Sequence, residues 1–417
     1  MLLALHSTGK AVSSSNALLA VHCDGSIDPE RLSRSLGRFL EFCPWPTARL
    51  QRPFPWGKLQ WAAGSDVAGE RPPVRSQPVA TVKDVEQAID AEINAAIDPR
   101  REPPVRFLSL EGAADSVLLM TWFHPLMDPR GAQNLLRHLV HIDCHGGGPP
   151  WGHAEPAFVR APDSRSFRAR GRLARKSLDY MRTLPRVEPV ASPSAHPTGR
   201  VCFRQVSFVE RDAAAEPVRL TREISWRLAV VGKAMRALWE ERNVPDVPFL
   251  LPIAVDLRPK GDLGPTFGNM LAFHFARFKP TDAADVPRLA SMLRDQMADA
   301  LRCGQIEAND VAMDFLQYRP LAFVRRALRR TGGETFSFNC ADVGDFPATL
   351  ERCFGRRVVN AYHVPAVPPR PGIGVFFNRC SGRSNLVVAW IDGVVTDEDV
   401  TRIVQTVREE LGWIETS

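Results

Sequence analysis

The sequence predicts an α/β protein of two lobes, each a mixed β-sheet flanked by helices, and three observations support this. The chain has 417 residues, more than one compact domain of ordinary size contains. Apolar segments typical of strands alternate with segments of helical periodicity along its whole length. A proline-rich connection at 186–200 interrupts this alternation, so we place the N-terminal lobe at 1–185 and the C-terminal lobe at 201–417.

Composition and charge exclude several classes of protein. With 44% hydrophobic and 24% charged residues, the chain is typical of a globular protein that buries a core. A net charge of +6 and a pI near 9.0 favour acidic partners weakly and do not require nucleic acid. Eight scattered cysteines suggest neither a zinc knuckle nor a disulfide framework, so we expect a reducing cytoplasm. The sequence has no secretory signal and no apolar run near the ~20 residues of a membrane helix, so we expect a protein that is not integral to a membrane. We also expect a monomer.

The N-terminal half is expected to contain three strands and two amphipathic helices. The strands are 16–23, 105–110 and 117–123, and the helices carry periodic apolar positions at Leu32, Leu36, Phe39 and Leu40, and at Val85, Ile89, Ile93 and Ile97. An arginine-rich stretch follows at 165–182. Its arginines go round a helix rather than forming one stripe, which predicts a solvated connecting helix. Docking of an acidic carrier protein or of the phosphates of CoA is the alternative.

The C-terminal half resumes the alternation of strands and helices. Strands are expected at 201–209, 249–255, 271–278, 335–339, 374–378 and 386–391. Helices carry buried stripes at Ile224, Leu228, Val231, Met235 and Leu238, and at Val400, Ile403, Val407 and Leu411. No repeat of short period is visible, which argues against solenoids and propellers.

One histidine stands at a position suited to chemistry. His124 directly follows the apolar strand 117–123, and Asp128 comes four residues later. A buried strand fixes the direction of its last side chain, and a histidine pKa of ~6.5 leaves much of the ring neutral. Such a ring can take a proton from an alcohol or an amine. On its own, the pattern is also typical of a core histidine followed by a turn aspartate.

Two further motifs lie in the second half of the chain. An apolar strand ends in the charged sequence VDLRP at 255–259, and GPTFGN follows at 264–269. In this order, HPLMD, VDLRP and FGN resemble the three spaced motifs of the chloramphenicol-acetyltransferase-like superfamily. That superfamily includes alcohol acyltransferases, wax ester synthases and the condensation domains of nonribosomal peptide synthetases. The resemblance covers most of the chain, because the opening strand, 97–110 and the closing strands are also similar.

The resemblance implies two lobes that meet along a tunnel, with His124 near its middle as the general base. An acyl thioester would enter from one side and a hydroxyl or amine acceptor from the other. It also implies no metal and no permanently bound cofactor, with acyl-CoA or a phosphopantetheinyl thioester as co-substrate. Asp128 would point away from the substrate towards Arg258, and Gly268 and Asn269 would shape the cleft between the lobes.

The sequence departs from the family pattern at two positions beside the active-site motif. Phe123 stands where many relatives have a first histidine, and Pro129 stands where a glycine is usual. Proline restricts the backbone of Asp128, although Gly131 can restore flexibility. This departure motivates an alternative, a catalytically silent scaffold that binds a carrier protein or an acyl chain.

Three other groups of residues are candidates for binding or catalysis. By alternation along a strand, Ser337 and Asn339 face one side and can donate hydrogen bonds to a developing oxyanion, although ordinary strand polarity explains them as well. An arginine run can attract an acidic carrier protein or the phosphates of CoA through Arg325, Arg326, Arg329 and Arg330. Five side chains able to bind a metal lie close together in the sequence: His138, His141, Asp143, Cys144 and His145. We interpret them as a fraying helix end rather than as a metal site.

Overall fold

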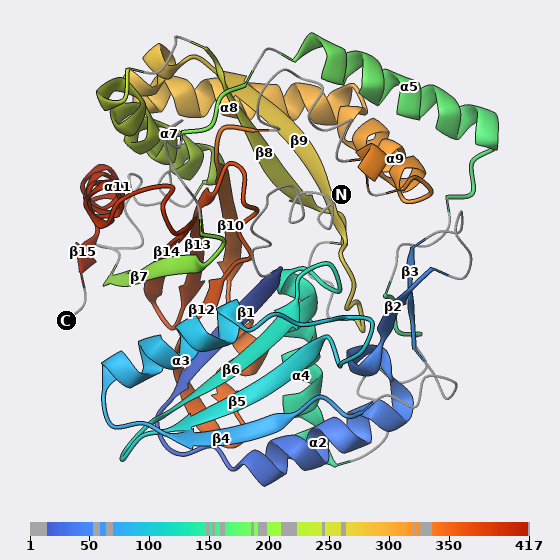
Figure 1. Cartoon of the computed structure of the whole chain (residues 1–417), viewed down its shortest axis with the longest axis vertical. Coiled ribbons are helices and arrows are strands. Elements are labelled where there is room, and N and C mark those ends of the chain that lie inside the picture. Colours follow the sequence, from blue (N-terminus) through green and yellow to red (C-terminus); the bar gives the residue numbers. More distant parts are fainter. Residues whose placement is uncertain are drawn as a thin grey trace.

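The structure is a computed structural model, and it shows an α/β protein of two lobes (Figure 1). It describes residues 15–52, 59–63, 70–146, 151, 155–158, 163–184, 187–190, 198–209, 223–243, 247–259, 264–320, 322–324 and 336–415. In this part of the chain, no helix has the length and apolar character needed to cross a bilayer.

The first lobe is built on a six-stranded sheet in the order β11-β12-β1-β6-β5-β4. Its strands are β1 (Asn16–Cys23), β4 (Val74–Pro78), β5 (Val105–Glu111), β6 (Ser116–Phe123), β11 (Arg352–Cys353) and β12 (Arg356–Val364). Neighbouring strands are antiparallel except for β4 and β5, which are parallel. Because β11 and β12 come late in the chain, this sheet combines residues from both sides of the expected connection at 186–200.

Both faces of the first sheet are covered. Its helices are α2 (Pro29–Phe42), α3 (Val82–Asn94) and α4 (Pro129–His145). Successive residues of β1 enter different cores, since side chains alternate between the faces of a strand. Leu18 packs in the core that includes α3, whereas Leu19 packs in the core that includes α2 and α4. A small pair of strands, β2 (Arg49–Gln51) and β3 (Gln60–Ala62), follows the short helix η1 (Trp45–Thr47).

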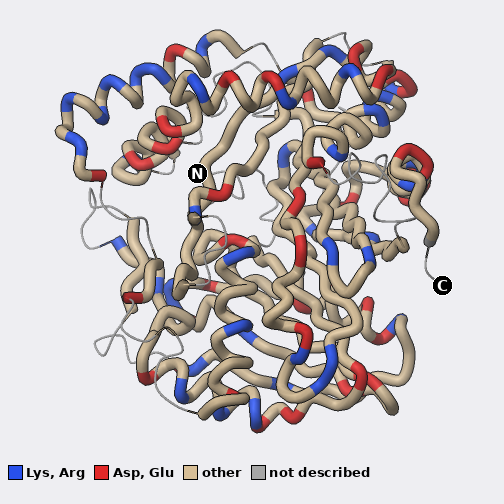
Figure 2. The backbone as a smooth tube through the Cα atoms, turned by 180° about the vertical axis from the view of Figure 1, so that it is seen from behind, with Lys and Arg blue, Asp and Glu red and all other residues tan. Residues whose placement is uncertain are grey.

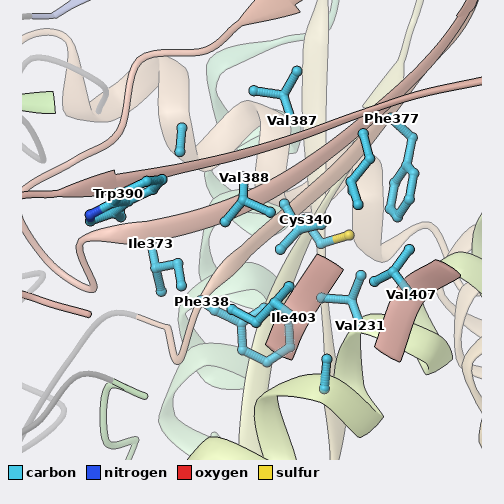
Figure 3. Packing of buried hydrophobic residues seen from close by; sticks show 14 of the residues in the cluster. Val231, Phe338, Cys340, Ile373, Phe377, Val387, Val388, Trp390, Ile403 and Val407 are labelled. Atoms are coloured by element: carbon cyan, nitrogen blue, oxygen red, sulfur yellow. The ribbon is translucent and has the colours of Figure 1, made fainter. Parts of the chain in front are cut away.

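The second lobe is built on a five-stranded sheet in the order β10-β13-β14-β7-β15. Its strands are β7 (Val201–Val209), β10 (Asn339–Asp345), β13 (Ile373–Cys380), β14 (Arg383–Ile391) and β15 (Ile414–Glu415). Helices α7 (Ile224–Glu241) and α11 (Asp397–Leu411) pack on it. Figure 3 shows this packing, in which Val231 of α7 and Ile403 of α11 lie among side chains of the sheet.

A two-stranded hairpin extends the second lobe. It consists of β8 (Phe249–Asp256) and β9 (Leu271–Phe278). The helices around it are α5 (Phe167–Thr183), α8 (Val286–Arg302), α9 (Gln305–Leu316) and the short helix η2 (Pro280–Ala284). Another short helix, η4 (Ala348–Leu350), lies between β10 and β11. Helix α5 lies on the outside of the molecule against α9 (Figure 1).

Most expected elements are present, but the prediction for 335–339 was wrong. The strand there begins at Asn339, which pairs with Gly374 of β13, and it continues to Asp345. Residues 336–338 instead run beside β8, where the Ser337 amide donates to the Leu250 carbonyl at 2.8 Å. Strand β12 was missed altogether, because its sequence RRVVNAYHV mixes charged, polar and apolar residues without clear alternation.

Candidate active site

A cavity of about 1140 Å³ lies between the lobes. The turn between β6 and α4 borders it from the first lobe, with His124 and Arg130. Strands β10, β12 and β13 supply further polar side chains, Asn339, Asp342, His363 and Asn378. We call the remaining part the apolar arm, because α5, α9, β8 and β9 line it mainly with side chains such as Leu178, Met181, Phe273, Phe275, Met313 and Phe315.

The turn after β6 holds the His124 ring in one tautomer. Its Nδ1 lies 3.3 Å from the carbonyl oxygen of Met127, which also accepts a 2.8 Å hydrogen bond from the Trp122 indole. Because a carbonyl oxygen can only accept, Nδ1 carries the proton of the neutral ring. The lone pair is therefore on Nε2, which has no hydrogen-bond partner among the described residues.

The surroundings of His124 keep its ring neutral. Burial lowers the pKa of His124 below its usual value, while the Met127 carbonyl and the charge of Asp128 oppose this shift. A neutral ring at pH 7 can accept a proton at Nε2. The side chain therefore has both the protonation state and the tautomer of a general base.

Asp128 is fully buried and binds three different segments. Its Oδ1 accepts hydrogen bonds from the Gly131 amide at 2.8 Å and from Arg258 at 2.9 Å. Its Oδ2 accepts from the Met270 amide at 2.8 Å. Asp128 is thus the N-cap of α4 and also joins the turn to the segment that precedes β9.

Arg258 completes this arrangement from the end of β8. Its guanidinium is 5% exposed and donates to Asp128, to the Gly268 carbonyl at 2.9 Å and to Asp256 at 3.0 Å. A buried ion pair needs such additional bonds to offset the loss of hydration. The structure therefore brings together the two charges that end separate apolar strands in the sequence.

Pro129 does not distort the turn, contrary to the concern raised by the sequence. It occupies the first position of α4, where proline is favoured because the first amide of a helix has no acceptor. Asp128 has φ −81° and ψ 173°, an extended conformation that a following proline favours.

The FGN segment packs tightly against its neighbours. A Cβ atom on Gly268 would lie 1.7 Å from the carbonyl oxygen of Phe158, and one on Gly131 would lie 2.1 Å from that of Phe267. These glycines let backbones approach where no other residue fits. Asn269 donates to the carbonyls of His124 at 3.2 Å and Pro125 at 2.9 Å, so it holds the base's turn against the segment 264–269.

Of the two expected oxyanion donors, only Asn339 borders the cavity. Ser337 is fully buried, and its hydroxyl accepts the Leu250 amide at 3.2 Å. The expectation that both residues face the same site was wrong, because Ser337 precedes β10 and strand alternation does not extend to it.

Two other groups of candidate residues remain, an arginine run and a cluster of metal-capable side chains. The arginine run with Arg325, Arg326, Arg329 and Arg330 lies outside the described residues. The described part of the chain contains no group of three or more side chains able to hold a metal ion. His138 instead packs edge-on against Trp151 and Phe267, and burial lowers its pKa to about 3.

One buried histidine beside the base was not expected from the sequence. His363 of β12 borders the cavity, and its Nε2 lies 3.1 Å from the Gln133 amide nitrogen of α4. Burial lowers the pKa of His363 to about 3, and the charges of Arg130 and His124 contribute. No local pattern indicated this residue, because β12 reaches the first sheet only through long-range pairing with β1.

No protein-family model matches the sequence, and no curated protein matches it. Solved structures do match. A starter condensation domain of rhizomide synthetase, in complex with C8-CoA and Leu-SNAC, aligns with a TM-score of 0.68 and 14% identity over 99% of this chain and 92% of that one. Trichothecene 15-O-acetyltransferase from Fusarium sporotrichioides aligns with a TM-score of 0.67 and 12% identity over 96% and 90%.

A third structure, the condensation domain of the Monacolin K polyketide synthase, aligns with a TM-score of 0.64 and 13% identity over 98% of this chain and 93% of that one. All three alignments span both lobes. The expected fold class is confirmed: the chain has the two-lobed fold of these condensation domains and of this acetyltransferase.

Proposed function

We propose that the protein is an acyltransferase that moves an acyl group from a thioester to a hydroxyl or amine, giving an ester or an amide. The observation that carries this proposal is the state of His124, a neutral ring beside a cavity whose Nε2 lone pair has no partner among the described residues. The fold supports it, since the similar structures include an acetyltransferase and a condensation domain with C8-CoA bound. Acyl-CoA or a carrier-bound phosphopantetheinyl thioester is the donor.

In the proposed reaction, Nε2 of His124 takes the proton from the acceptor as its oxygen or nitrogen attacks the thioester carbonyl. The carbonyl electrons move to its oxygen, which gives a tetrahedral intermediate. When the carbonyl re-forms, the carbon–sulfur bond breaks and the imidazolium returns the proton to the leaving thiolate. The products are the ester or amide and a free thiol, and the enzyme is unchanged.

Two residues assist in this scheme without forming a covalent intermediate. Asn339 borders the cavity on β10 and is the candidate donor for the negative oxygen of the intermediate. Asp128 acts through the turn, because it fixes the start of α4 and the segment before β9 relative to His124. Arg258, Gly268 and Asn269 support the same turn.

The test is release of free thiol from a panel of acyl-CoA and acyl-N-acetylcysteamine donors with alcohol and amine acceptors. His124→Ala is expected to lower turnover by roughly 100-fold or more, the size typical of losing a general base. His141→Ala is the matched control, because this histidine lies on the exposed side of α4 against His145, and it should retain activity.

Two results would count against the proposal. Near-normal turnover by a folded His124→Ala protein would remove His124 from the mechanism. No thiol release above background with any donor and acceptor would favour the scaffold instead. Docking of an acidic carrier at Arg325–Arg330, a monomeric state and a cytoplasmic location stay predictions.

A further inference from the structure

Helix α5 presents a continuous basic face to solvent. It contains six basic residues and one acidic residue. The sequence suggested that the arginines go round the helix, but Arg170 alone turns inward, lying 3.7 Å from Asp314 and over the Phe315 ring of α9. The arginines spaced four, three and seven residues apart occupy one exposed face: Arg168, Arg172, Arg175 and Arg182. Figure 2 shows the recurrent basic positions along this outer helix.

The charges of this face are only partly neutralised by the protein. Arg168 and Arg172 form no ion pair with the described residues. Arg175 and Arg182 share a single carboxylate, Asp179, at 3.7 and 3.0 Å. The face therefore retains positive charge for an external anionic partner.

An exposed apolar edge runs beside the basic face. Phe167 is 78% exposed and Leu178 is 56% exposed, and both lie on the same flank of α5. Phe323, which is 53% exposed, follows α9 on the other side of the opening. Leu178 and Phe323 also line the cavity, so this edge is the rim of the apolar arm.

The helix is held in place from its inner side. Ser177 is buried and donates to Asn309 of α9 at 2.8 Å, and Tyr180 donates to the Phe275 carbonyl at 2.8 Å. At the exposed edge, the Phe167 ring also touches Phe315 edge-on, with ring centres 5.8 Å apart, and it stays 78% exposed. The basic face and the apolar edge are thus presented on a folded, anchored helix.

We propose that the outer surface of α5, with Phe323, docks on an anionic lipid bilayer. An amphipathic helix that lies on a bilayer combines basic side chains for the headgroups with aromatic or aliphatic side chains that enter the interface. The observed surface has both, side by side. A nucleic acid would use the arginines but would leave the apolar edge uncovered.

The cavity behind the rim agrees with a lipid surface as the partner. The apolar arm opens between α5 and the segment after α9, and Met181, Met313 and Phe315 line its interior. If the proposed acyl transfer holds, docking would let a substrate with an alkyl chain pass from the bilayer into the arm without crossing water. That consequence rests on the proposed function, whereas docking itself does not.

Sedimentation of the full chain with lipid vesicles tests the docking. We expect binding to vesicles of phosphatidylcholine mixed with phosphatidylglycerol, little binding to phosphatidylcholine alone, and weaker binding as salt is raised. Reversing Arg168, Arg172 and Arg175 together to Glu should weaken binding on the order of 100-fold. The matched control reverses three exposed arginines of the β11–β12 hairpin, Arg352, Arg356 and Arg357, and should bind within a few-fold of the parent.

A second measurement tests whether the apolar edge enters the acyl-chain region of the bilayer. Phe167→Trp adds an indole at the rim to a chain that has nine tryptophans of its own. Lipids brominated in their acyl chains should therefore quench the fluorescence of this variant in anionic vesicles more than that of the parent. Equal losses for both triple variants, with thermal unfolding showing both folded, would overturn the proposal, and so would quenching no greater than that of the parent. Vesicle binding needs no substrate, so it is decided separately from thiol release.

Discussion

The turn from His124 to Asp128 and the helix α5 border the same cavity, yet they are held in different ways. The turn is bonded on several sides, through Asp128 to α4, Arg258 and Met270, and through Asn269 to the carbonyls of His124 and Pro125. Among the described residues, helix α5 is bonded to its neighbours through Ser177 and Tyr180 on its inner side and through Lys176, whereas Arg168 and Arg172 form no ion pair. A proton transfer needs groups fixed within a fraction of an ångström, whereas a docking surface needs groups that remain unsatisfied.

The largest expected effect concerns the ion pair of the turn. Asp128→Ala or Arg258→Ala leaves one buried charge without its partner and should reduce the free energy of unfolding by about 3 to 5 kcal/mol. The double variant should lose less than the sum of the two single variants. Denaturant unfolding of the four proteins measures this coupling.

The ion pair of Asp179 and Arg182 on α5 should contribute much less to stability than the ion pair of the turn. Asp179 and Arg182 are 3.0 Å apart, but their side chains are 53% and 78% exposed. Removing either should change stability by at most about 1 kcal/mol. A coupling as large on α5 as in the turn would contradict the difference described here.

Replacing a glycine by alanine should have opposite effects on stability in the two regions. Gly268→Ala places a methyl group against the Phe158 carbonyl and should destabilise the protein by roughly 1–3 kcal/mol. Gly171→Ala, on α5, meets no atom within 4 Å and should stabilise it by about 0.5–1 kcal/mol, because alanine is the better helix former. The midpoint of thermal unfolding should therefore fall in Gly268→Ala and rise in Gly171→Ala. A rise in both variants would show that the turn can relax around the added methyl group.

The smallest expected effect is a shift in pH dependence. Turnover should rise with pH as His124 loses its proton, with the midpoint below the usual histidine value of ~6.5 because burial lowers its pKa. The negative charge of Asp128 raises this pKa, so Asp128→Asn should move the acid limb of kcat/KM to lower pH. Asp179→Asn on α5 should leave the limb in place. A limb that moves upward in Asp128→Asn would mean that another group titrates.

The turn could be predicted from the sequence because its chemistry follows local patterns. His124 ends one apolar strand and Arg258 ends another, and charged residues at such ends commonly meet. These positions and the family resemblance together gave Arg258 as the expected partner of Asp128, and the structure places the two 2.9 Å apart. The effect of Pro129 was misjudged, since its position relative to the helix start decides whether proline strains the backbone.

Other parts could not be predicted because they depend on distant pairing. His363 reaches the cavity only when β12 lies beside β1, where it is opposite Leu19. Asp342 and Gly344 made β10 resemble a loop, although it pairs in parallel with β13. The arginines of α5 were misassigned because the exact start of the helix and the position of α9 decide which of them face outward.

The place of β12 in the first sheet has a consequence for biosynthesis. β1 pairs with β6 on one side and with β12 on the other, and β12 ends only at Val364. During translation, β1 therefore leaves the ribosome long before its second neighbour exists and must wait with the backbone N–H and C=O groups of one edge unpaired. A fragment that stops at 185 would keep that edge permanently. The two lobes are spatial units of the finished molecule and not successive folding units of the nascent chain.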